Sequence, residues 1–76
     1  MSVELDKIVN AVNRLEAQYR IHDPNDRESR SLLDILVKSA ELTISVVKES
    51  KLDKDQREML QKLSFRVQAV KEKAGL

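Results

Sequence analysis

The sequence has no cysteine, no tryptophan, one glycine and one proline in 76 residues. The absence of cysteine excludes a disulfide framework and every zinc or iron–sulfur site that uses thiolate ligands. A single glycine cannot supply the glycine-rich loops that hold nucleotide phosphates, and a single histidine cannot supply a metal site built from several imidazoles. We therefore expect no cofactor and no bound metal.

Neither sign of charge dominates, because 14 basic residues face 13 acidic ones and the net charge is +1. A global basic field that would hold nucleic acid or an anionic membrane is therefore missing. The longest apolar run is three residues, 35–37, whereas a membrane span needs about 20. The first residues lack the basic and apolar regions of a secretory signal. These features predict a cytoplasmic protein with no membrane association.

Apolar residues recur at helical spacing in three segments, and these segments predict a single all-α domain over residues 1–76. The first helix is expected at about 3–21, the second at about 24–50 and the third at about 54–74. In the first and third, apolar residues alternate at intervals of three and four, as in heptad repeats. These rows are Leu5, Ile8, Val12, Leu15 and Tyr19, and Leu60, Leu63, Val67, Val70 and Ala74.

The expected helix ends carry residues that suit them. The predicted N-caps are Ser2, Asp23 and Asp53. Pro24 fits the first position of a helix, Gln56 stands at the capping-box distance from Asp53, and Gly75 is placed as a C-terminal cap. Short connections favour antiparallel neighbours, so we expect a small three-helix up-down-up bundle.

The second helix has an apolar arc of about two-thirds of its circumference, whereas an ordinary surface helix needs little more than about 100°. One apolar row is Leu32, Ile35, Leu42 and Val46, and a second row beside it is Leu33, Leu36, Ala40, Ile44 and Val47. Two neighbouring helices cannot cover both rows. We therefore expect a partner-binding face that contains Val37, Ala40 and Ile44, and self-association through the heptad-like rows.

The only phenylalanine, Phe65, lies on the opposite side of the third helix from its heptad row and beside Ala69. An aromatic side chain next to a small residue is typical of an interface anchor. We expect Phe65 and Ala69 to bind a partner. The change Phe65→Ser is then expected to preserve helicity and to weaken association.

Residues for catalysis are not assembled in this sequence. His22 falls at a predicted helix end and has no second imidazole to work with. The acidic stretch that starts at Asp23 resembles the start of a calcium loop, but Glu28 stands where the loop requires glycine. We therefore expect no enzyme activity and no small-molecule substrate.

Two functions are compatible with this pattern. The first is a non-catalytic helical module that binds itself or another protein as an adaptor, regulator or inhibitor. The second is a nucleic-acid-binding regulator, which would lose affinity steeply with salt. The second would use the basic residues in and before the third helix: Lys51, Lys54, Arg57, Lys62, Arg66, Lys71 and Lys73.

Overall fold

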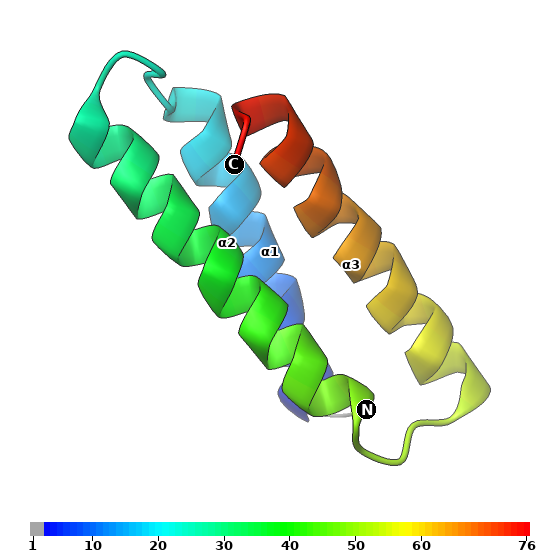
Figure 1. Ribbon diagram of the computed structural model, residues 1–76. Helices are drawn as coiled ribbons and strands as arrows, with labels where there is room; N and C mark the ends of the chain where they lie inside the picture. Colours follow the sequence, from blue (N-terminus) through cyan, green and yellow to red (C-terminus); the bar gives the residue numbers. More distant parts are fainter. Residues whose placement is uncertain (1–2) are drawn as a thin grey trace.

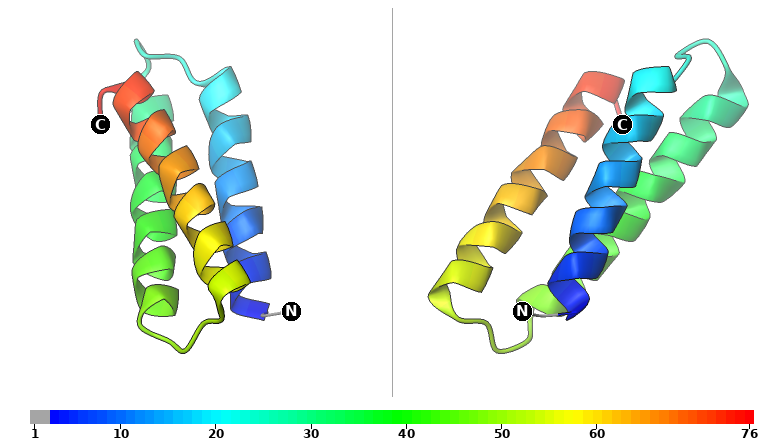
Figure 2. Two further views of the ribbon diagram at one scale, coloured as in Figure 1. Left: turned by 90° about the vertical axis from the view of Figure 1, so that its right-hand side faces the viewer. Right: turned by 180° about the vertical axis from the view of Figure 1, so that it is seen from behind.

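The computed structural model describes residues 3–76 as a small all-α bundle of three helices that pack against one another. Helix α1 spans Val3–Ile21, α2 spans Arg27–Lys48 and α3 spans Lys54–Ala74. The loops 22–26 and 49–53 lie at opposite ends of the bundle (Figure 1). Each helix contacts both others, and the bundle measures 42 × 17 × 17 Å (Figure 2). The N-cap predicted at Ser2 lies outside the described residues.

Helix α2 begins at Arg27, so the start predicted at Pro24 is wrong. The Asp23 carboxylate accepts a hydrogen bond from the Asn25 amide at 2.9 Å, and the Asp26 amide donates to the Asp23 carbonyl at 3.1 Å. This local turn uses the groups that a helix start would need. Asp26 is the N-cap instead, because its side chain accepts from the Glu28 amide.

Helix α3 begins with the predicted capping box. The Asp53 carboxylate accepts from the Gln56 amide at 2.8 Å, and the Gln56 side chain accepts from the Asp53 amide at 3.1 Å. At the other end Gly75 has a φ of 71°, a left-handed conformation that glycine adopts without a steric penalty. Both predicted ends are confirmed, since each depends on groups within one helical turn.

The core is one row of apolar side chains from each helix. In α2 the buried row is Leu33, Val37, Ala40, Ile44 and Val47. The expectation that Val37, Ala40 and Ile44 form a face outside the bundle is wrong, because they are 1%, 0% and 8% exposed. Their row is apolar at every position, and Ala40 is its smallest side chain. The rows from the other helices are Leu5, Ile8, Val12 and Leu15, and Leu60, Leu63, Val67 and Val70.

Helices α1 and α3 are joined by a charged cluster at mid-length. The Arg66 guanidinium donates from Nε to Glu16 Oε2 at 3.1 Å and from Nη2 to both Glu16 Oε1 and Asn13 Oδ1. A guanidinium that engages both carboxylate oxygens fixes the relative height of two helices. The hydrogen bonds from Arg66 hold the pKa of the Glu16 carboxyl below its ordinary value of 4.5.

A carboxyl group with a lowered pKa stabilises the fold above its ordinary pKa, and this contribution is lost as the pH falls through the lowered value. We expect Glu16→Gln to lower the free energy of unfolding by up to about 1 kcal/mol at pH 7, because the pair is partly exposed. At pH 2 the difference between variant and wild type should disappear. Thermal unfolding followed by circular dichroism at both pH values measures it. A difference that is equally large at pH 2 would show that Glu16 stabilises by packing alone.

Candidate interaction surface

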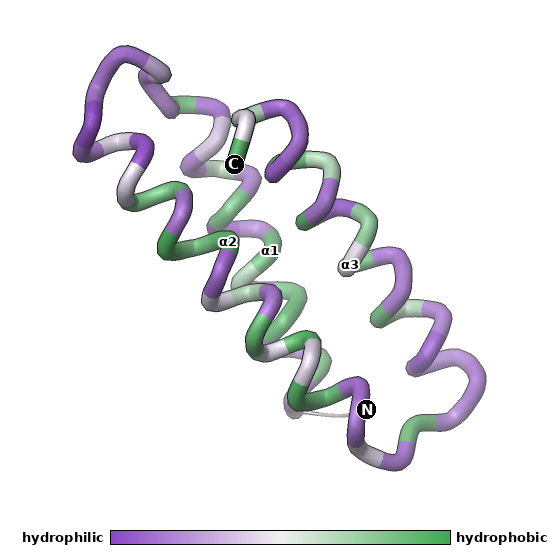
Figure 3. The backbone as a smooth tube through the Cα atoms, in the orientation of Figure 1, coloured by the Kyte–Doolittle hydropathy of each residue, from purple (hydrophilic) through white to green (hydrophobic). Residues whose placement is uncertain are grey.

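One face of α2 carries large aliphatic side chains that no other part of the described chain covers. Leu32, Ile35, Leu42 and Val46 are 45%, 59%, 67% and 63% exposed. With Ser39 at the middle they occur at alternating intervals of three and four residues, a heptad pattern. We call these five residues the outer stripe. Figure 3 shows hydrophobic residues in successive turns along most of α2.

The outer stripe lies on the side of α2 turned away from the bundle, because the buried row faces α1 and α3. Its ends, Leu32 and Val46, are 14 residues apart, about 21 Å along a helix. On one flank stands the half-buried Leu36, which packs against the core. Beside it the Thr43 hydroxyl donates to the Ser39 carbonyl at 2.9 Å. This bond satisfies the hydroxyl within the helix, so the flank presents few polar groups that need water.

The other flank of the stripe is polar but weakly charged. Ser31, Lys38 and Ser45 occupy it, and Lys38 pairs with Asp34 one turn earlier at 3.0 Å. Charged side chains at the stripe positions themselves occur only beyond its two ends, at Glu28 and Glu49. The result is an apolar strip with Leu36 and Thr43 on one side and Ser31, Lys38 and Ser45 on the other. Such a strip is typical of surfaces that receive another helix.

Phe65 and Ala69 lie on a different face. The Phe65 side chain is 65% exposed, and Ala69, one turn later, is also exposed. Both point away from the core row of α3. The structure therefore places two of the five predicted partner-binding residues at the surface and the other three, those on α2, in the core.

The outer stripe was the part of the surface that the sequence prediction missed. The sequence pattern predicts both apolar rows of α2, but it places Val37, Ala40 and Ile44 on the outer face, whereas the structure buries them. The residue that distinguishes the outer row of α2 from the inner row is Ser39. A row interrupted by serine and bounded by Glu28 and Glu49 suits the surface better than a row with no polar member.

His22 has a structural role at the end of α1. Its ring stacks on Tyr19 with the centroids 6.3 Å apart, and Nδ1 lies 3.3 Å from the Ser29 hydroxyl. These contacts tie the end of α1 to the first turn of α2. Within residues 3–76, no group of three or more His, Cys, Asp or Glu side chains is arranged to hold a metal ion.

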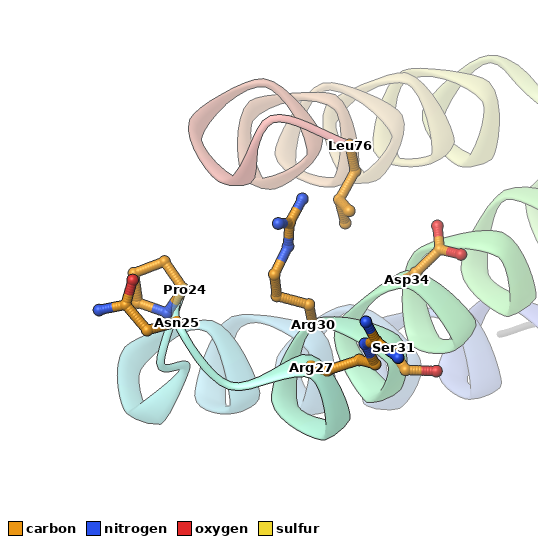
Figure 4. Close-up of a pocket in the computed structure, with 7 residues that line it drawn as sticks. All are labelled: Pro24, Asn25, Arg27, Arg30, Ser31, Asp34 and Leu76. Carbon is orange, nitrogen blue, oxygen red and sulfur yellow. The ribbon is translucent and has the colours of Figure 1, made fainter.

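A hollow of about 520 Å³ lies beside the loop between α1 and α2. In Figure 4 the Arg30 side chain extends from α2 toward Leu76 at the end of the chain. Most of the lining residues are exposed, and Arg27 and Asp34 bring opposite charges to it. A small-molecule site normally encloses its ligand with apolar walls and a few convergent polar groups. This hollow offers neither. Its lining is Pro24, Asn25, Arg27, Arg30, Ser31, Asp34 and Leu76.

Two of the basic residues considered for nucleic-acid binding are engaged in contacts between helices. Arg66 binds Glu16 of α1, and the Lys71 ammonium lies 3.4 Å from the Glu41 carboxylate of α2. Lys54, Arg57 and Lys62 are exposed on α3. The engaged residues leave fewer cations free for phosphate groups, which provide most of the affinity in non-specific nucleic-acid binding.

None of the helices in residues 3–74 has the length and apolar character that crossing a membrane requires. The strongest feature of this surface is thus the outer stripe of α2, with the Phe65 face as a smaller second one. Comparison with known proteins found no matching protein family, no similar curated protein and no similar solved structure.

Proposed function

We propose that this chain is an up-down-up three-helix bundle that acts as a non-catalytic interaction module. It binds a helical surface of a partner protein through the outer stripe of α2, and it serves as an adaptor, regulator or inhibitor by occupying that surface. The observation that carries the proposal is the heptad spacing of four aliphatic side chains that are each 45–67% exposed.

Four aliphatic side chains in one row can contribute more to binding than single leucines scattered over a surface. Complete burial of a Leu, Ile or Val side chain contributes about 1.5–3 kcal/mol. Each stripe residue is already partly covered, so a partner would gain about 1 kcal/mol from each. Single exposed apolar residues are common and need no explanation. Four in one row gain this energy together when one helix covers them.

The shape of the stripe favours a helix as the bound element. Anchors at intervals of three, four and seven residues on a straight rod match an amphipathic helix laid alongside it. Ser39 at the centre leaves room for a large side chain from the bound helix. An extended peptide would instead need an open sheet edge, and residues 3–76 form no strand.

The proposal is tested with the double variant Ile35→Lys/Leu42→Lys, which places two charges in the stripe. Wild type and variant are coupled to beads and exposed to an extract of the cells that produce the protein, and bound proteins are quantified by mass spectrometry. Loss of two aliphatic contacts and burial of two charges should weaken stripe-dependent binding more than tenfold. Circular dichroism should show unchanged helicity, since both sites are exposed.

Phe65→Ser is the matched control, because Phe65 is similarly exposed on a different helix. We expect this variant to capture the same proteins as wild type, because Phe65 lies on a different face from the outer stripe. This replaces the expectation from the sequence pattern alone that Phe65→Ser weakens association. Equal capture by wild type and the Ile35→Lys/Leu42→Lys variant would refute the proposed role of the stripe. Loss of capture with Phe65→Ser alone would transfer the role to α3.

A further inference from the structure

We propose that the partner of the outer stripe is a second copy of this chain, with the two α2 helices side by side and antiparallel around a two-fold axis. This inference rests on the proposed function and names its partner. An isologous contact of this kind needs a surface that is complementary to itself. Two properties of α2 supply that complementarity: the order of its side chains along the stripe and the placement of charge.

The order of side chains fits an antiparallel pair in which the residue numbers of facing positions sum to 81. Ser39 then lies opposite the partner's Leu42, and Ile35 lies opposite the partner's Val46. Each pair occurs twice, because the two-fold axis passes midway between Ser39 and Leu42. The small serine thus receives the most exposed leucine of the stripe, which is 67% exposed. Large therefore packs against small where Ser39 meets Leu42. Ile35 and Val46 place two aliphatic side chains against each other, and Leu32 lies opposite Glu49 at the end of the partner's α2.

The charges select this arrangement over two others. In a parallel pair Glu28 would face Glu28 of the second copy, and Glu49 would face Glu49, which places like charges at both ends. An antiparallel pair can also be shifted by one heptad so that facing residue numbers sum to 74. The two Lys38 residues would then lie only about 3 Å apart along the axis. In the proposed register Lys38 lies opposite the partner's Thr43, and no like charges oppose each other along the stripe. Like-charge contacts of this type are a common means by which helices reject wrong pairings.

Cysteine cross-linking tests the orientation and register directly, because the chain has no cysteine of its own. Two single variants, Ile35→Cys and Val46→Cys, are mixed in equal amounts in a glutathione redox buffer. In the proposed register position 35 of one copy faces position 46 of the other, within the Cα separation of about 7 Å that a disulfide tolerates. The Ile35 positions of the two copies, by contrast, lie eleven residues apart along the axis, about 16 Å, which is too far for a disulfide. The same separation holds for two Val46 positions.

We expect the mixed disulfide to exceed either homodimer more than tenfold by mass spectrometry under non-reducing conditions. Homodimers of Ile35→Cys alone would show a parallel pair and overturn the proposal. An Arg14→Cys variant, exposed on α1, measures collisional cross-linking. A mixed disulfide no more abundant than this background would also overturn the proposal. In that case stripe-dependent capture from the cell extract still decides the proposed function separately.

Light scattering supplies a second readout without cysteine. Wild type at high concentration should have about twice the 8.7 kDa mass of one chain, and dilution should reduce it. The Ile35→Lys/Leu42→Lys variant should remain at the single-chain mass at every concentration, while Phe65→Ser should dimerise like wild type. A monomeric wild type, or a dimer that survives in the double variant, would contradict the α2 contact.

Discussion

The change Leu33→Ala is expected to reduce the free energy of unfolding by about 2–5 kcal/mol, the range for truncation of a buried leucine. Leu33 is 0% exposed and belongs to the core row of α2. Truncation removes apolar contact with both neighbouring helices and leaves a cavity that a helical backbone cannot close. For a chain of this length each 1 kcal/mol lowers the melting temperature by about 4–8 °C. The melting temperature should therefore fall by about 8 °C or more.

The control is Leu42→Ala on the same helix. It removes the same atoms and changes helix propensity equally, but Leu42 is 67% exposed. We expect a loss below about 0.5 kcal/mol when both variants are measured at concentrations where the chain does not associate. Similar melting temperatures for the two variants would mean that both rows of α2 are equally buried. That result would contradict the assignment of the inner and outer rows.

The change Ala40→Leu is expected to destabilise the bundle by about 1–3 kcal/mol even though leucine is a good helix former. Ala40 is 0% exposed at mid-helix, where the added isobutyl group would meet the core rows of the neighbouring helices. The helices must then separate or side chains must leave their preferred rotamers. Chemical denaturation followed by circular dichroism measures the loss as a shift of the midpoint.

The same substitution at Ala69 provides the comparison, because Ala69 lies on the exposed face of α3. Ala69→Leu should leave the free energy of unfolding within about 0.5 kcal/mol of the wild-type value. If Ala40→Leu were neutral or stabilising, Ala40 would face open space, as the sequence pattern alone led us to expect. The pair of variants therefore distinguishes a core position from a partner-binding one without any knowledge of the partner.

Local chemistry explains which parts of the fold were predictable. The capping box at Asp53 and Gln56 and the C-cap at Gly75 depend on groups within one helical turn. The start of α2 was misplaced because two aspartates, Asp23 and Asp26, both suit an N-cap. The choice between them depends on the turn at Asp23 and on contacts of Ser29, which accepts from the Asp23 amide at 3.1 Å.

The candidate site was less predictable, for a reason visible in α2. Periodicity places residues around a helix but does not say which direction points to the neighbours. Two apolar rows therefore gave two possible inner faces. Only packing against α1 and α3 selects one, because those helices must bury their own rows against the same side.

The amino-acid sequence by itself determined the number of helices, their class and the capping at both ends of α3, because each follows from spacing and hydrogen bonds within one segment. It also determined that α2 has more apolar surface than two neighbours can cover. Only the tertiary structure decided that Val37, Ala40 and Ile44 lie inside and that the outer stripe lies outside. The physical reason is that burial depends on the positions of three helices at once, and no single helix contains that information.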